Sequence, residues 1–191
     1  MQDKDKDKEK ENPPESPEPE AVPETRAIGI FQDITEQKAE EIIYALKIYE
    51  SESGEPIDFF ISSNGGSAAD MFAIYDFMRN SREEVVINTF GLGKVMSAAV
   101  LLLAAGTKGE RKIGKHCRVM IHSVIGGTGG PLQDLKNEME EIQQMQDMYI
   151  SAMCKETNLT KKKLKDLFSK NVNVYISAED AVKYGIADII V

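Results

Sequence analysis

Ser97 and His122 are the two residues whose types and surroundings best suit hydrolytic chemistry. Ser97 opens the apolar stretch 97–105, which predicts a buried helix, and His122 ends the apolar stretch 119–122, which predicts a strand. A serine hydroxyl becomes a nucleophile when a base lies within hydrogen-bond reach, and histidine is the commonest such base. Because the chain holds only two histidines, His116 and His122, few candidates for that base exist.

Backbone amides near this serine are candidates for stabilising a negative charge. N–H groups at the start of a helix have no partner within the helix, so the amide of Ala98 is a candidate oxyanion donor. A second candidate is Gly66, because the Gly65-Gly66 pair follows a predicted strand and no Cβ blocks the approach of its backbone. Taken alone, these features also fit a buried serine in an Ala-rich helix and a structural histidine, which are the commoner cases.

The charge of the chain is concentrated at its beginning. The 191 residues carry a formal net charge of −9, which argues against nucleic acid and anionic membranes as partners. Residues 1–25 hold nine acidic and four basic side chains and five of the seven prolines, so we expect a disordered acidic tail. That tail is either a solvated extension or a docking arm. Residues 26–191 are expected to form one domain.

Cysteine content and the amino terminus bear on compartment and cofactors. Cys117 and Cys154 lie in no pattern suited to zinc, so no metal or other cofactor is expected, and reduced thiols indicate a reducing, cytoplasmic compartment. The charged amino terminus does not resemble a signal peptide. The longest apolar stretch, 95–105, is too short for a bilayer, which needs about 20 residues.

Hydrophobic periodicity predicts an α/β fold with a mostly parallel sheet, because strands alternate with helices. Thr35 is expected to cap the first helix, and Thr160 begins a short one. The expected strands are 27–31, 57–62, 85–90, 119–122 and 186–191, and the expected helices are 35–51, 68–80, 97–105, 131–155, one from 160, and 178–184.

From residue 26 to residue 191 the sequence resembles the proteolytic subunits of the Clp protease, the ClpP family of serine peptidases. The matching segments keep the order of the family: Ser63-Asn-Gly-Gly66, Ile74-Tyr-Asp76, Ser97 followed by Leu-Leu-Ala-Ala-Gly106, Lys108-Gly-Glu-Arg111, Arg118-Val-Met-Ile-His122, and Ser177-Ala-Glu-Asp-Ala-Val-Lys-Tyr-Gly-Ile-Ala-Asp188. The resemblance implies repeated β-β-α units of the ClpP/crotonase fold and a long protruding handle helix, with the handle at about 123–155.

The same resemblance implies roles for single residues. Ser97 aligns with the nucleophile and His122 with the general base, while Gly66 and Ala98 take the oxyanion-hole positions. The third position departs, because Asn173 stands where the family has an aspartate. An asparagine oxygen can orient the imidazole but brings no negative charge to stabilise the imidazolium. We therefore expect a Ser-His-Asn serine endopeptidase with weak or conditional activity.

The resemblance also implies an assembly and partners. ClpP-like subunits form heptameric rings that stack into a tetradecamer around the active sites, cleave unfolded polypeptides and receive them from a separate AAA+ unfoldase ATPase. The helix at 131–155, with Met139, Met145, Met148 and Met153 on one face, is expected to join the rings.

Two other interpretations stay open. Asn173 also fits a non-catalytic or modulatory subunit that co-assembles with an active ClpP. A crotonase-like acyl-CoA enzyme would share the fold and the oxyanion hole but would need no Ser97–His122 pair, so that pair argues against it.

Overall fold

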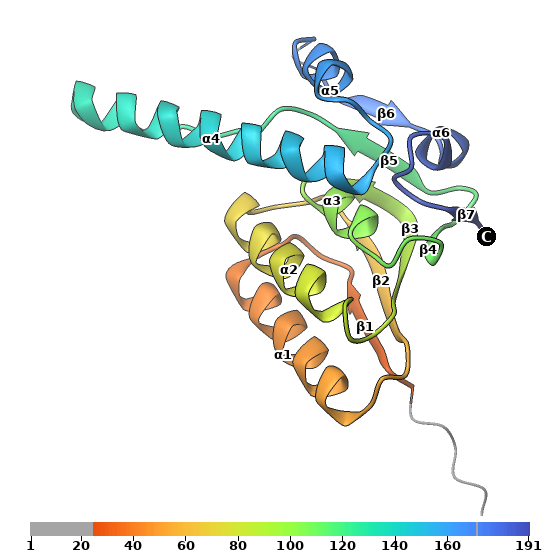
Figure 1. Ribbon diagram of the computed structural model, residues 1–191. Coiled ribbons are helices and arrows are strands. Elements are labelled where there is room, and N and C mark those ends of the chain that lie inside the picture. Colours follow the sequence, from red (N-terminus) through yellow and green to blue (C-terminus); the bar gives the residue numbers. More distant parts are fainter. Residues whose placement is uncertain (1–24, 171) are drawn as a thin grey trace, which may run out of the picture.

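The computed structural model of the chain describes residues 25–170 and 172–191 (Figure 1). The predicted disordered tail at 1–25 therefore lies, apart from its last residue, outside the described residues. In the described part, a mixed α/β domain carries one long helix that projects from its body. None of the helices formed by these residues is both long and apolar enough to cross a membrane.

A mostly parallel sheet of seven strands forms the centre of the domain, which confirms the predicted fold class. The strands are β1 Ala27–Ile30, β2 Ile57–Ser63, β3 Ile87–Met96, β4 Arg111–Ile113, β5 Arg118–Ile121, β6 Val174–Ile176 and β7 Ile189–Ile190. The main order is β1-β2-β3-β4-β7. Strand β3 pairs with β4 along its first half and with β5 along its second half, and β6 joins β5 antiparallel.

Six helices lie around this sheet in the described residues. They are α1 Glu36–Glu52, α2 Ala68–Ser81, α3 Ala99–Ala104, α4 Leu132–Glu156, α5 Lys161–Phe168 and α6 Ala178–Lys183. Helices α1 and α2 lie side by side against one face of β1 and β2 (Figure 1). The predicted cap at Thr35 is confirmed, since its hydroxyl accepts a hydrogen bond from the amide of Lys38. Thr160, which was expected to begin the short helix, caps α5 in the same way by accepting from the amide of Lys163.

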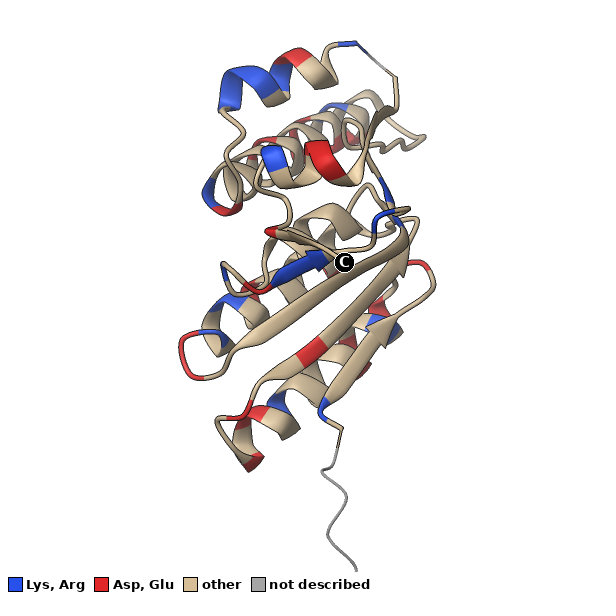
Figure 2. Ribbon diagram, turned by 90° about the vertical axis from the view of Figure 1, so that its right-hand side faces the viewer, with Lys and Arg blue, Asp and Glu red and all other residues tan. Residues whose placement is uncertain are grey.

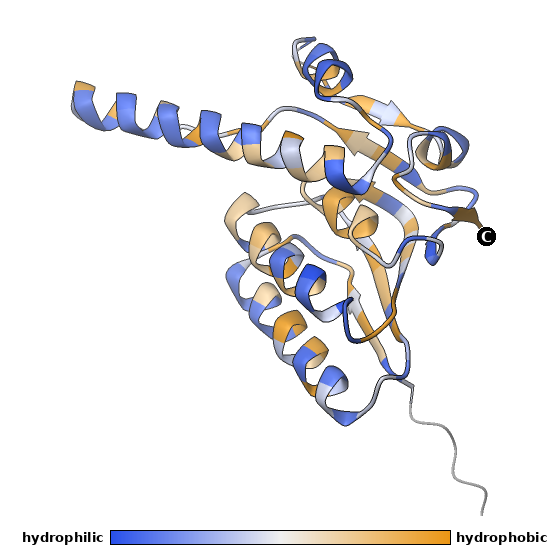
Figure 3. Ribbon diagram, in the orientation of Figure 1, coloured by the Kyte–Doolittle hydropathy of each residue, from blue (hydrophilic) through white to orange (hydrophobic). Residues whose placement is uncertain are grey.

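The apolar core lies between the sheet and its helices (Figure 3). In β2 the side chains of Ile57, Phe59 and Ile61 are fully buried, as alternation along a strand predicts. All six residues of α3 are buried, which explains its uninterrupted apolar sequence. Charged residues lie mainly on the helices and loops (Figure 2). Four of the eight residues of α5 are lysines.

The structure corrects several predicted boundaries. Strand β3 continues to Met96 rather than ending at residue 90, because Gly91 and Gly93 interrupt the apolar pattern but not the backbone pairing. The helix expected to begin at Ser97 begins two residues later, at Ala99. Strands β4 and β6 were not predicted, since three residues are too few to show an alternation, and the final strand is shorter than expected.

Helix α4 has a buried end and a projecting end. Its buried residues all lie at or after Tyr149, whereas Leu132 and Met139 are 69% and 71% exposed. The methionine face expected from sequence is therefore divided, with Met153 in the core and Met139 in solvent. The projecting part is visible at the left of Figure 1.

An ionic cluster fixes the buried end of α4. The carboxylate of Glu156, 1% exposed, accepts hydrogen bonds from Arg79 and Arg82 of the α2 segment and from the hydroxyl of Tyr75. Burial alone would raise the pKa of Glu156, but the hydrogen bonds from Arg82 and Tyr75 and the nearby charges outweigh burial and lower that pKa. Arg82 also donates to the carbonyl of Ala105, so the cluster joins α2, the end of α3 and α4.

Candidate active site

Ser97 occupies a sharp turn between β3 and α3. Its φ of +55° is the only positive φ outside glycine in the described residues. A serine in this region carries strain of about 1 kcal/mol or more, and such a turn from strand to helix is a known way to expose a serine hydroxyl. The turn is held from both sides, since the Ser97 amide donates to the Met120 carbonyl at 2.7 Å and the Ser97 carbonyl accepts from the Tyr149 hydroxyl at 3.3 Å.

The Gly65-Gly66 pair packs directly against this turn. Gly65 has a φ of +97°, and a Cβ on it would lie 2.7 Å from the Cβ of Ser97 and 3.0 Å from the amide nitrogen of Ala98. A Cβ on Gly66, whose φ is +147°, would lie 2.3 Å from the carbonyl oxygen of Ile34. The two glycines therefore fill a space between Ile34 and the serine turn that admits no side chain.

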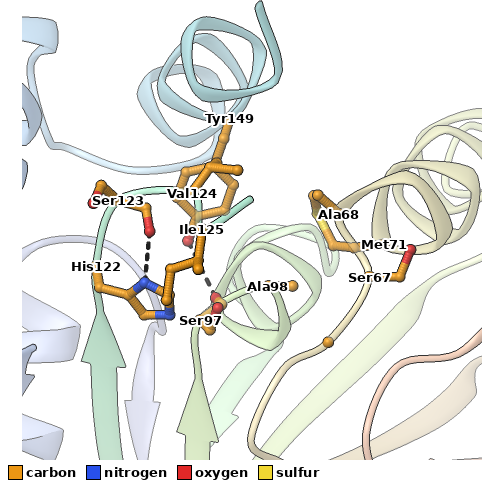
Figure 4. Close-up of a pocket in the computed structure, with 11 residues that line it drawn as sticks. Ser67, Ala68, Met71, Ser97, Ala98, His122, Ser123, Val124, Ile125 and Tyr149 are labelled. Carbon is orange, nitrogen blue, oxygen red and sulfur yellow. Dashed lines mark hydrogen bonds between the residues drawn. The ribbon is translucent and has the colours of Figure 1, made fainter. Parts of the chain in front are cut away.

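The two amides predicted as oxyanion donors are free of protein acceptors in the part of the chain that the structure describes. Within residues 25–170 and 172–191, neither the N–H of Gly66 nor that of Ala98 donates a hydrogen bond to another residue. Both residues line a cavity of about 320 Å³ together with Ser97, His122 and Tyr149 (Figure 4). Free N–H groups beside a serine hydroxyl are the arrangement that a developing oxyanion needs.

His122, the first residue after β5, lines the same cavity. Its Nδ1 lies 2.6 Å from the carbonyl oxygen of Ser123. A carbonyl oxygen can only accept, so the proton of the neutral ring is on Nδ1 and Nε2 carries a free lone pair. Figure 4 shows the second ring nitrogen on the side that faces Ser97.

The Ser97 hydroxyl and the His122 imidazole line the same cavity. No hydrogen bond joins Ser97 and His122 in the part of the chain that the structure describes. Such bonds are often long before substrate binds, so the arrangement fits a nucleophile and its base before the reaction.

Asn173 is the predicted site residue that the structure does not join to the others. The antiparallel pairing of β5 and β6 ends at Ile121 and Val174, and one further step would set His122 opposite Asn173. Asn173 is nevertheless exposed and does not line the cavity. Within the described residues no hydrogen bond connects it to His122, whose Nδ1 is bound to Ser123 instead.

Tyr149 is a site residue that sequence analysis missed. Burial raises the pKa of its hydroxyl, which stays protonated and donates to the carbonyl of Ser97. The sequence placed Tyr149 on the apolar face of a helix, and that pattern indicates burial without indicating what the hydroxyl contacts.

Comparisons with known proteins identify the family. A sequence model of the Clp protease family matches residues 19–191. The chain belongs to the Clp protease family. It is 33% identical to an ATP-dependent Clp protease proteolytic subunit of Borreliella afzelii, over 85% of this chain and 81% of the relative. It is 31% identical to proteolytic subunit 1 of Prochlorococcus marinus subsp. pastoris, over 86% of this chain and 83% of the relative. It is 34% identical to proteolytic subunit 3 of a Synechococcus strain, over 85% of this chain and 80% of the relative.

Membership confirms the resemblance inferred from the quoted motifs and the class of enzyme, a serine-type peptidase. The mixed α/β sheet and its helices agree with the fold of that family. Within residues 25–170 and 172–191, no group of three or more His, Cys, Asp and Glu side chains is placed to hold a metal ion.

The packing at Gly65 leads to a test of the turn. Gly65→Ala should lower the free energy of unfolding by about 2 kcal/mol, since the new Cβ meets Ser97 and the backbone must keep a positive φ. Gly54→Ala is the matched control, because a Cβ on Gly54 meets nothing within 4 Å. Denaturant unfolding would measure both, and equal stability of the two variants would contradict the close packing.

Proposed function

We propose that this chain is a serine endopeptidase that hydrolyses peptide bonds of unfolded polypeptides. Ser97 is the nucleophile, His122 the general base, and the amides of Gly66 and Ala98 form the oxyanion hole. The observation that carries the proposal is the strained turn at Ser97, which shares one cavity with His122 and two amides that have no protein acceptor in the described residues. Membership of the Clp protease family supports the same assignment.

The geometry supports an acyl-transfer mechanism. The Ser97 hydroxyl adds to the carbonyl carbon of the substrate while its proton passes to Nε2 of His122. The carbonyl oxygen becomes an oxyanion and accepts hydrogen bonds from the amides of Gly66 and Ala98. The imidazolium then returns the proton to the leaving amine as the C–N bond breaks. Water, deprotonated by His122, hydrolyses the acyl-enzyme and restores the hydroxyl.

The activity we propose is weak or conditional. In the predicted Ser-His-Asn triad the third residue is neutral. Asn173 is exposed, and among the described residues it forms no hydrogen bond with the imidazole. A carboxylate would stabilise the imidazolium formed during proton transfer, whereas the neutral carbonyl of Ser123 only orients the ring.

The substrate is proposed to bind as an extended strand. Residues 122–129 follow β5 but belong to no helix or strand. Apart from the Ser123 carbonyl and the Val124 N–H, which bond to His122 and Gln146, their backbone groups are available beside the cavity. A peptide paired with this segment would be recognised through its backbone, which suits unfolded chains of varied sequence. The segment is supported from behind, since a Cβ on Gly126 would lie 2.5 Å from Ile142 of α4.

The relatives are named as ATP-dependent proteolytic subunits. On that basis we propose that an AAA+ unfoldase ATPase delivers substrate to heptameric rings stacked as a tetradecamer, in which this subunit forms a homo-oligomer or mixes with another ClpP subunit. The exposed residues of the projecting half of α4, Leu132 and Met139 among them, would provide contacts. The thiols of Cys117 and Cys154 are free, which fits a reducing cytoplasmic compartment.

Sedimentation velocity tests the assembly. At micromolar concentration the mass should be many times the 21.2 kDa of one chain, because the exposed apolar residues of α4 need a partner surface. A mass equal to one chain would contradict the assembly.

Hydrolysis of a fluorogenic peptide tests the nucleophile. Ser97→Ala should reduce kcat about a thousandfold or more, since it removes the hydroxyl proposed to form the acyl-enzyme. Ser51→Ala is the control, because Ser51 is an exposed serine near the end of α1 and does not line the cavity. Full hydrolysis by Ser97→Ala would refute the assignment. An assembled wild-type particle without hydrolysis would favour the alternative of a modulatory subunit.

The third position is tested by restoring a carboxylate. Asn173→Asp should raise kcat by about tenfold or more. Continuing the β5–β6 register by one step sets residue 173 opposite His122, and a carboxylate there would stabilise the imidazolium. Asn80→Asp adds the same charge at an exposed position of α2 outside the cavity and should leave kcat unchanged. An Asn173→Asp variant with equal or lower turnover would show that the missing charge does not limit activity.

A further inference from the structure

One peptide group beside the cavity is hydrogen-bonded at both of its ends. The carbonyl oxygen of Ser123 accepts from Nδ1 of His122 at 2.6 Å, and the N–H of Val124 donates to Oε1 of Gln146 at 2.7 Å. The carbonyl of Ser123 and the N–H of Val124 belong to the same planar amide, so they cannot turn independently. Gln146 and His122 are therefore connected through a single rigid group.

Gln146 lies on α4 about one turn before Tyr149, which lines the cavity. It is half-buried and stands three residues before Tyr149, so the two side chains share one face of the helix. Tyr149 donates to the carbonyl of Ser97, while Gln146 reaches the amide that orients His122. Helix α4 thus contacts the backbone behind the proposed nucleophile and behind the proposed base.

The Ser123–Val124 amide has little else to fix it. The described residues from 122 to 129 pair with no strand, and Gly126 and Gly127 follow closely. Without an acceptor at position 146, this amide is free to rotate and to turn its carbonyl away from His122. With the acceptor in place, the two hydrogen bonds polarise the amide in the same direction and strengthen each other.

We propose that Gln146 is a positioning residue that acts on His122 through the Ser123–Val124 amide. It holds the Ser123 carbonyl where that oxygen accepts the Nδ1 proton, and this keeps the lone pair of Nε2 free to take the proton of Ser97. In the described residues Asn173 is exposed and forms no hydrogen bond with His122, so it does not orient the imidazole. The backbone carbonyl of Ser123 takes that role instead. The proposal rests on the proposed peptidase function.

The test compares acceptor and non-acceptor side chains of similar size. Gln146→Met fills the same space without an acceptor, and Gln146→Glu keeps an oxygen for the N–H of Val124. Gln143→Met is the matched control, since Gln143 lies on α4 one turn earlier and its amide donates to Asp147 instead. Kinetics of fluorogenic peptide hydrolysis by the assembled particles, with kcat and KM separated, is the first readout.

Gln146→Met should lower kcat by about tenfold or more with KM changed less than about twofold, because the base is misplaced while the cavity is kept. Gln146→Glu should stay within about threefold of the wild type, and Gln143→Met should match it. Asn173→Ala should cost less than Gln146→Met. A wild-type kcat for Gln146→Met, or equal losses in Gln146→Met and Gln146→Glu, would overturn the proposal.

A crystal structure of the Gln146→Met particle is the second readout and does not depend on activity. Nδ1 of His122 should lie outside hydrogen-bond distance of the Ser123 carbonyl, whereas Gln146→Glu should retain that bond. An unchanged bond in Gln146→Met would refute the positioning role even if Ser97→Ala shows that the peptidase function is right. Hydrolysis that survives Ser97→Ala would instead refute the peptidase function, and the crystal structures would still decide the role of Gln146.

Discussion

The contact between the Gly65-Gly66 pair and the turn at Ser97 is the constraint on which the site depends. Strands β2 and β3 run parallel and adjacent, so their carboxyl ends meet at one edge of the sheet. The chain must turn sharply after each, and the two turns come so close that Gly65 has no room for a Cβ. This closeness sets the amides of Gly66 and Ala98 beside the Ser97 hydroxyl, and it explains why the serine accepts a left-handed backbone conformation.

Helix α4 connects this edge of the sheet to the rest of the molecule. Its carboxyl end is anchored by Glu156 through two arginines and a tyrosine, and its middle supplies Tyr149 and Gln146 to the backbone around the cavity. Its amino-terminal part projects with no buried residue before Tyr149. A helix that is fixed at one end and free at the other joins the proposed oligomer contact to the proposed catalytic residues within one rigid element.

The sequence indicated which residues would lie close together better than it indicated their contacts. Ser97, His122, Gly66 and Ala98 line one cavity, because each lies at the end of an apolar element and parallel strands bring such positions to one edge. The positive φ of Ser97 could not be predicted, because it results from the packing of Gly65 and from the bonds to Met120 and Tyr149. The hydrogen bonds of Gln146 and Tyr149 could not be predicted for a similar reason. Helical periodicity indicates on which face of the helix a residue lies, but not which group its side chain contacts.

The most direct test of the account is a crystal structure of the assembled particle after reaction with a fluorophosphonate. The account predicts a covalent adduct on the Ser97 hydroxyl oxygen, with the phosphonyl oxygen within hydrogen-bond distance of the amides of Gly66 and Ala98 and with His122 beside the adduct. An unmodified Ser97, or a phosphonyl oxygen directed away from both amides, would contradict it.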